Sequence, residues 1–238
     1  MFNQEDLQGV EEQQDRLGGV YTLDSGVYDG IIKLAYVLPS AKSQSKCVVT
    51  VIDYGGIEVT QRTWILTGDG KPTYEKNGKK FMLPGYEQIN DLCLMSTGLP
   101  LTEQTVENKT IKVWDANEKK EVEKSMPVIT SILGKPITAG ILKVVENKQE
   151  KVGDDYVDTN EKREINEVDK YFHTASKKTT VEFMKKVDLP EADLFYTKWK
   201  EKNTGVTRDN FKAVAGPAGQ APGQGSGAPK AAAKSLFG

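Results

Sequence analysis

Nucleophilic or metal chemistry in this chain would fall to one histidine and two cysteines. His173 has no Ser or Cys partner at a recognisable catalytic spacing, and Cys47 and Cys93 each lie in an apolar run. Two cysteines and one histidine are too few for a tetrahedral zinc site. The segment GDGKP at 68–72 lacks the spacing and the Ser or Thr of a phosphate-binding loop. The sequence therefore predicts a protein that is not an enzyme and that uses no metal or other cofactor.

A second pattern joins a cation to an aromatic ring two residues further on. RTW carries Arg62 and Trp64, and KVW carries Lys112 and Trp114. Both segments alternate as strands do, so each pair places its two side chains on one face. Single-stranded nucleic acid binds to such surfaces because cations attract phosphates and unpaired bases stack on rings, at roughly 1–3 kcal/mol per base. The two pairs favour nucleic-acid binding.

A predicted hairpin at 72–83 adds side chains of the same two kinds. Asn77-Gly78 supplies the positive φ angles that its tight turn needs. The basic and aromatic residues of this hairpin are Tyr74, Lys76, Lys79, Lys80 and Phe81. Three further lysines extend the predicted basic strip, namely Lys33, Lys46 and Lys71.

Each of the two tryptophans also has a structural interpretation, because tryptophan is well buried on average. The face opposite Trp64 is ambiguous, since it mixes apolar and polar residues: Val59, Gln61, Thr63 and Ile65. The face opposite Trp114, with Ile111, Val113 and Asp115, looks more like core. Base contact and core packing stay open for both residues, and base contact is slightly favoured for Trp114.

The hydrophobic pattern predicts mainly strands from residue 21 to about 145. In 28–38, alternation places Ile32, Leu34 and Tyr36 on one face. Further strands are expected at 47–53, 57–66, 109–115 and 126–146, the last broken at Gly134-Lys135-Pro136, and helices at 84–98, 179–187 and 191–203. Three strands, a helix and two more strands follow the order of an OB fold, with the 72–83 hairpin inserted. Other small barrels or sandwiches give a similar order.

Four parts are expected along the chain. An acidic arm at 1–20 holds five acidic residues against Arg16, and an OB-fold-like five-stranded barrel occupies 21–175. C-terminal helices follow at 176–211. Gly, Ala and Pro make up 17 of the 27 residues of 212–238, the composition of a flexible linker. No stretch has the roughly 20 apolar residues of a membrane span, and no signal peptide is recognisable, so a cytoplasmic protein is expected.

Four stretches carry a resemblance to a known family: GVYDGIIKLAYVLPSAKSQSKCVVTVI, LPGYEQINDLC, LGKPITAGIL and KSLFG. In these the chain resembles the single-stranded DNA-binding proteins of tailed bacteriophages. The resemblance implies an OB fold that coats exposed DNA during replication and recombination. It also implies a tail whose tip, with Lys234, Leu236 and Phe237, docks replication or recombination proteins. In many such proteins the tail is acidic and competes with DNA; this tail is weakly basic, which puts that role in doubt.

The leading hypothesis is therefore a non-catalytic single-stranded DNA-binding protein, working in the host cytoplasm if a phage encodes it. A β-rich structural or scaffolding protein of a phage particle, with no nucleic-acid role, is the alternative. An RNA-binding OB protein is a third hypothesis, because contact with the 2′-hydroxyl is what separates RNA from DNA recognition.

Overall fold

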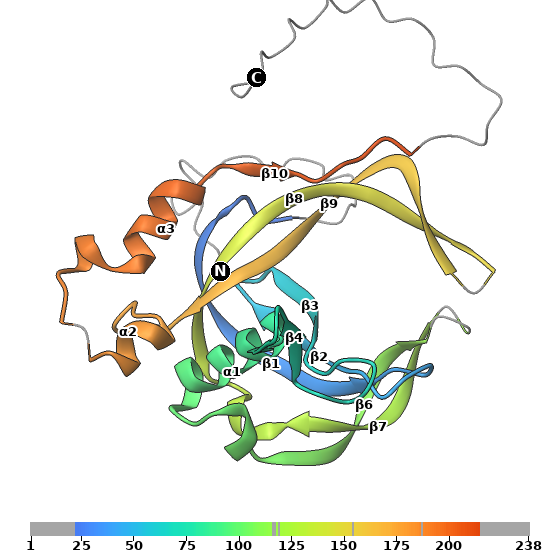
Figure 1. Ribbon diagram of the computed structural model, residues 1–238, viewed down its shortest axis with the longest axis horizontal. Helices are drawn as coiled ribbons and strands as arrows, with labels where there is room; N and C mark the ends of the chain where they lie inside the picture. Colours follow the sequence, from blue (N-terminus) through green and yellow to red (C-terminus); the bar gives the residue numbers. More distant parts are fainter. Residues whose placement is uncertain (1–21, 116–117, 119, 154, 187, 215–238) are drawn as a thin grey trace, which may run out of the picture.

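The computed structural model describes residues 22–115, 118, 120–153, 155–186 and 188–214 (Figure 1). The predicted acidic arm and most of the predicted tail lie outside these residues. The strands are β1 (Gly26–Pro39), β2 (Lys46–Asp53), β3 (Glu58–Trp64), β4 (Thr73–Lys76), β5 (Lys79–Met82), β6 (Val106–Asp115), β7 (Lys120–Ile129), β8 (Pro136–Val152), β9 (Asp155–Phe172) and β10 (Thr207–Asp209). The helices are α1 (Pro84–Thr97), α2 (Thr180–Met184) and α3 (Phe195–Asn203), with short 3-10 turns at Leu101–Glu103, Thr130–Ile132 and Glu191–Asp193. The predicted mainly β class is confirmed.

One largely antiparallel sheet organises the chain, as Figure 1 shows. β1 pairs with β2 along one edge and with β8 along the other, β2 pairs with β3, and β8 pairs with β9. These five strands and α1 follow the order of an OB fold. The structure differs from the expected order in one respect. The fourth and fifth strands are β8 and β9, whereas the segment expected as the fourth strand, 109–115, belongs to an additional β6–β7 hairpin.

The sheet does not close between β3 and β9 by backbone pairing within the described residues. Two glutamine side chains span this seam instead. Gln61 of β3 accepts a hydrogen bond from the Val168 N–H of β9 at 2.7 Å, and Gln88 of α1 donates to the Val168 carbonyl. The Gln61 amide in turn donates to the Gln88 Oε1 at 3.2 Å. Both backbone groups of Val168 are thereby satisfied at a position where a buried peptide would otherwise lose its partners.

A β-bulge in β1 decides which side chains face the main core. The register with β2 shifts between Ile32 and Leu34, leaving Lys33 as the extra residue. Ile32 and Ala35 consequently both belong to the inner core, although they are three residues apart. Leu34 and Tyr36 lie with the second cluster on the other face. The expectation that Ile32, Leu34 and Tyr36 share a face is wrong, because one extra residue reverses the alternation.

Of the three apolar clusters in the described residues, the two that involve β1 and β2 lie on opposite faces of the sheet. In the inner one, α1 contributes Ile89, Leu92 and Cys93, each at most 1% exposed. The outer cluster joins the β1–β2 face to the β6–β7 hairpin, and its buried members are Tyr36, Cys47, Val49, Val113, Met126 and Val128. The β6–β7 hairpin therefore folds over the outer face of β1 and β2.

Several local predictions are confirmed. Asn77 and Gly78 have φ angles of 53° and 69°, as the tight turn between β4 and β5 requires. α1 begins at Pro84, and Gly98 ends it with φ 79° and an N–H bonded to the Leu94 carbonyl. The chain also breaks between β7 and β8, where Gly134 has φ 73°.

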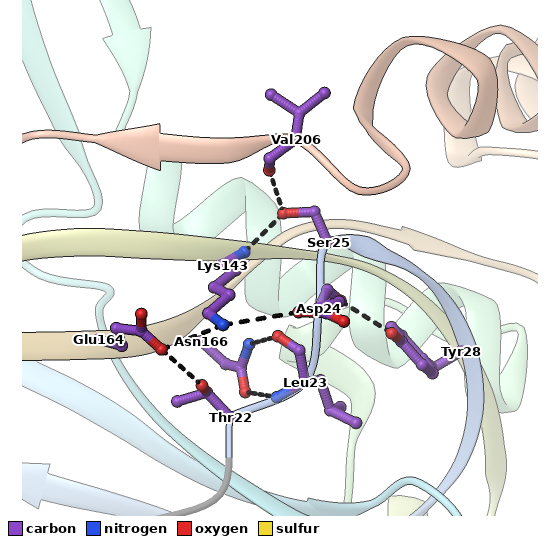
Figure 2. Close-up of polar contacts among 9 residues, drawn as sticks. All are labelled: Thr22, Leu23, Asp24, Ser25, Tyr28, Lys143, Glu164, Asn166 and Val206. Carbon is purple, nitrogen blue, oxygen red and sulfur yellow. Dashed lines mark hydrogen bonds and ion pairs between the residues drawn. The ribbon is translucent and has the colours of Figure 1, made fainter.

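The first described residues and the C-terminal segment meet on β8, as Figure 2 shows. Ser25, 3% exposed, donates to the Val206 carbonyl at 2.5 Å and accepts from the Lys143 N–H at 2.7 Å. The Asn166 side chain bonds both backbone groups of Leu23 at 2.8 Å. One serine and one asparagine thus fix the start of β1 to β8, β9 and the strand that follows α3.

The C-terminal segment continues along the sheet beyond α3. β10 pairs in parallel with β8, so the region expected to hold only helices also contributes a strand. Two asparagines extend this attachment as backbone substitutes. Asn147 bonds the N–H and the carbonyl of Lys212, at 2.9 and 2.7 Å. Asn160 does the same for Val214, at 2.8 and 3.1 Å.

Replacing Gln88 by alanine tests the seam. The substitution removes the donor that Gln88 gives the Val168 carbonyl and leaves the Gln61 amide with Thr63 alone as acceptor, so we expect the free energy of unfolding to fall by about 1–3 kcal/mol. Urea titration measures the change. Gln44→Ala is the matched control, because it makes the same chemical change at an exposed side chain and is expected to cost under about 0.5 kcal/mol. Equal losses in the two variants would contradict the role of the seam.

Acid should weaken the link between α2 and α3. The Glu182 carboxylate, 9% exposed, accepts from Thr179 N at 2.8 Å and Phe195 N at 2.8 Å. Burial raises the pKa of Glu182, but these hydrogen bonds outweigh it and hold the pKa below its usual value. This contribution to stability is complete above the ordinary pKa of about 4.3 and is lost as pH falls through the lowered one.

The measurement is the difference in the free energy of unfolding between the unsubstituted protein and Glu182→Gln, followed from about pH 7 down to about pH 3. We expect the difference to shrink in the acidic half of this range. A difference that is constant with pH would show that the carboxylate is not stabilised by folding.

Candidate nucleic-acid interface

The Arg62–Trp64 pair lies on the outer face of β3. Arg62 is opposite Val49 and Trp64 is opposite Cys47 in the register with β2, and directly opposed residues share a face. Trp64 is 48% exposed, whereas its neighbours Thr63 and Ile65 are 7% and 8% exposed. The core interpretation of Trp64 is therefore wrong.

The opposite face of β3 is mixed in sequence because it forms the seam. Thr63 donates to the Gln88 Oε1 at 3.3 Å, and Gln61 bonds both Gln88 and Val168. These two polar residues point inward to satisfy buried groups rather than outward to solvent. Their inward orientation leaves Arg62 and Trp64 on the side that is open to a ligand.

The β4–β5 hairpin presents an aromatic stack flanked by lysines. The Tyr74 and Phe81 rings lie 5.7 Å apart at an interplanar angle of 29°. Lys76 and Lys79 form the next pair on this face, since side chains two positions apart on a strand point the same way. Both rings remain exposed, at 38% and 43%. Lys80 lies on the other face, opposite Glu75.

The hairpin ends close to the backbone at the end of β3. The Leu83 N–H closes its base on the Pro72 carbonyl at 2.9 Å. Two residues later, a Cβ on Gly85 would lie 2.1 Å from the Trp64 carbonyl oxygen, so the backbones of α1 and β3 touch there. We call these two groups of side chains together the β3–hairpin surface. Its residues are Arg62, Trp64, Tyr74, Lys76, Lys79 and Phe81.

The Lys112–Trp114 pair does not join this surface. Trp114 is 63% exposed, so it too is not a core residue. Val113, its neighbour, packs in the outer cluster with Cys47 and Val49, so Trp114 points to the opposite face of the hairpin. The residues across from Trp114 and Lys112 on β7 are Glu121 and Glu123, which give that face negative charge.

Of the three other predicted lysines, two lie beside a carboxylate and the third is at the start of β2. Lys33, the bulge residue, lies 3.5 Å from Asp53. Lys71 lies 2.7 Å from Asp69, and hydrogen bonds from Lys71 and Thr67 lower the pKa of Asp69 to about 2. Lys46 is exposed at the start of β2. Lys33 and Lys71 are therefore less available to a phosphate than the cations of the β3–hairpin surface, whereas Lys46 lies beside the end of β3, where its carbonyl accepts from the Ile65 N–H at 2.9 Å.

Two lysines of the β6–β7 hairpin were not among the predicted basic residues, although they lie on the inward face of that hairpin. Lys109 and Lys124 lie on the face that carries Ile111 and Val113, which turns toward the outer cluster. Lys124 is paired with Asp115 at 2.8 Å, and Lys109 with Glu107 at 3.5 Å. The sequence could have placed Lys109 on this face, because it is two residues before Ile111 and four before Val113 in a strand.

Both cysteines are buried in apolar clusters, and the histidine is hydrogen-bonded within a turn. Burial raises the pKa of Cys93 to about 12, and burial also raises the pKa of Cys47. Neither thiol is therefore activated as a nucleophile. The His173 Nδ1 accepts a hydrogen bond from the Ser176 N–H at 3.2 Å. Among the described residues, no group of three or more His, Cys, Asp or Glu side chains is arranged to hold a metal ion.

Comparisons with known protein families and curated sequences found no match. No protein-family model matches the chain, and no curated protein sequence matches it. Within the described part of the chain, none of the helices has the length and apolar content to cross a membrane.

Tryptophan fluorescence tests the placement of these side chains. Trp64 and Trp114 are exposed, whereas Trp199 is 4% exposed and its Nε1 donates to Asp169 at 2.7 Å. We expect a Trp64→Phe/Trp114→Phe variant to emit at shorter wavelength and to be quenched by acrylamide several-fold less than the unsubstituted protein. Each single variant should fall between the two. Equal quenching of the double variant and the unsubstituted protein would contradict the exposure of both indoles.

Proposed function

We propose that this protein binds single-stranded DNA without catalysis, using the β3–hairpin surface. Two observations carry the proposal: Trp64 and Arg62 share the outer face of β3 with the Trp64 ring exposed, and the β4–β5 hairpin presents the exposed Tyr74–Phe81 stack. Exposed aromatic rings beside cations are costly to leave in water and match the bases and phosphates of a single strand.

The proposed surface makes two kinds of contact with the strand: rings stack on bases, and cations contact phosphates. Bases stack on Trp64 and on the Tyr74–Phe81 pair, which is sequence-tolerant because every base has a flat apolar face. Arg62, Lys76 and Lys79 follow the phosphates. Neutralising three phosphates predicts a slope of about −2 for the logarithm of affinity against the logarithm of salt concentration.

The biological setting of the proposal rests on the resemblance to phage single-stranded DNA-binding proteins. Coating of exposed DNA during phage replication and recombination, in the host cytoplasm, is the role proposed. Recruitment of replication or recombination proteins belongs to the tail residues Lys234, Leu236 and Phe237, which lie outside the described residues.

The experiment compares two exposed tryptophans on different faces. We expect Trp64→Ala to weaken binding of a labelled thymine oligonucleotide of about 30 nucleotides by roughly 5- to 150-fold, the loss of one stacking partner. Trp114→Ala, the matched control, should change affinity by less than about twofold because its face lies away from the site. Fluorescence anisotropy at several salt concentrations measures both affinity and slope.

Three results would contradict the proposal. They are no binding at low salt, an equal loss in the two variants, or a larger loss in Trp114→Ala. Absence of binding would favour the structural or scaffolding alternative. A uridine oligonucleotide of the same length, if bound more tightly than the thymine one, would favour RNA as the ligand.

A further inference from the structure

A cavity of about 480 Å³ lies between the last turn of α1 and α2, two helices that Figure 1 shows beside each other. Its walls are mainly apolar. Leu94 and Met95 come from α1, and Phe183 and Met184 come from α2. The volume is in the range of pockets that bind a ligand or a short peptide segment.

The apolar wall on the α2 side is open to solvent. Met184 is 77% exposed and Phe183 is 41% exposed, although α2 is otherwise held by the buried Glu182 carboxylate. Large exposed apolar side chains on a small fixed element mark binding surfaces more often than isolated ones do. This wall is therefore formed in advance and uncovered within the described residues.

The C-terminal end of α1 adds an electrostatic feature to the apolar wall. α1 ends at this cavity without Lys or Arg in its last turn, so the partial negative charge of its C-terminus is not offset there.

We propose that the tail segment Lys234–Phe237 of the same molecule binds in this cavity. Leu236 and Phe237 are the large apolar residues of a stretch otherwise dominated by Gly, Ala and Pro. They match the apolar walls, and Lys234 places a cation by the C-terminal end of α1. This inference is independent of the proposed DNA-binding function, and it makes binding in the cavity a state that alternates with recruitment of other proteins by the same segment.

The tail is long enough to reach the cavity. Leu236 is 22 residues beyond Val214, the last described residue, and such a stretch spans up to about 75 Å when extended. A domain of this size has a radius of gyration of roughly 16 Å, so its diameter is about 40 Å. Tethering also raises the effective concentration of the segment to the order of millimolar, so modest intrinsic affinity is enough for binding.

The methionine methyl groups provide the readout. Met95 and Met184 line the cavity, whereas Met126 lies in the outer cluster and serves as the internal reference. In methyl NMR of the full chain, Leu236→Ser/Phe237→Ser is expected to shift the Met95 and Met184 signals and to leave Met126 unchanged. Ala231→Ser/Ala232→Ser, the matched control in the same tail, is expected to shift none of them.

A synthetic peptide of residues 229–238 tests binding directly. Added to the Leu236→Ser/Phe237→Ser chain, it should return the two signals toward their original positions with saturation below about 1 mM. Met184→Glu, introduced into that chain, should lower the affinity for the peptide by at least about tenfold. Because the Met184 side chain is exposed, this variant is expected to fold.

Three results would overturn the proposal. The first is that neither signal moves in the tail variant, and the second is that the peptide binds equally well with and without Met184→Glu. The third is a dependence of the Met95 and Met184 positions on protein concentration between about 20 and 400 μM, which would assign the occupant to a second molecule. Positions that are independent of concentration support binding within one chain.

Discussion

The fold depends on how the two backbone groups of Val168 are satisfied. β3 and β9 approach each other without a backbone ladder in the described residues, so Gln61 and Gln88 supply the missing donor and acceptor. Because Gln88 belongs to α1, the same contacts also hold the helix over the inner core. The inward orientation of Gln61 sets the orientation of the rest of β3. Arg62 and Trp64 face outward as a result, and the candidate site is a consequence of the seam.

Local signals in the sequence were sufficient for much of the fold. Asn77-Gly78 and Gly98 need positive φ angles, and Pro84 suits the first turn of a helix, so the hairpin and α1 were predictable to within a residue or two. The bulge at Lys33 was not predictable, because nothing in 28–38 distinguishes an extra residue from regular alternation. β9 was missed because much of it carries polar and charged residues on both faces of an extended ribbon, which removes the apolar period.

The candidate site shows the same division. That Arg62 and Trp64 share a face followed from strand alternation alone. Whether that face was open to solvent did not, because it depends on contacts of Gln61 with residues far along the chain. For Trp114 the alternation was equally clear, but its face was decided by how the β6–β7 hairpin folds over β1 and β2. Which residues share a face of one strand is a local property, whereas how one strand or hairpin packs on another depends on distant residues.

The attachment of the C-terminal segment has a mechanical consequence. β10 runs parallel to β8, and Asn147 and Asn160 continue the line of contacts as far as Val214. A pull on the tail directed along β10 loads these contacts in shear, so that several hydrogen bonds carry the tension together instead of parting one after another. Ser25 anchors the far end of the line through Val206. The segment can bear a load applied at its tail while the strands that carry Trp64 stay in place.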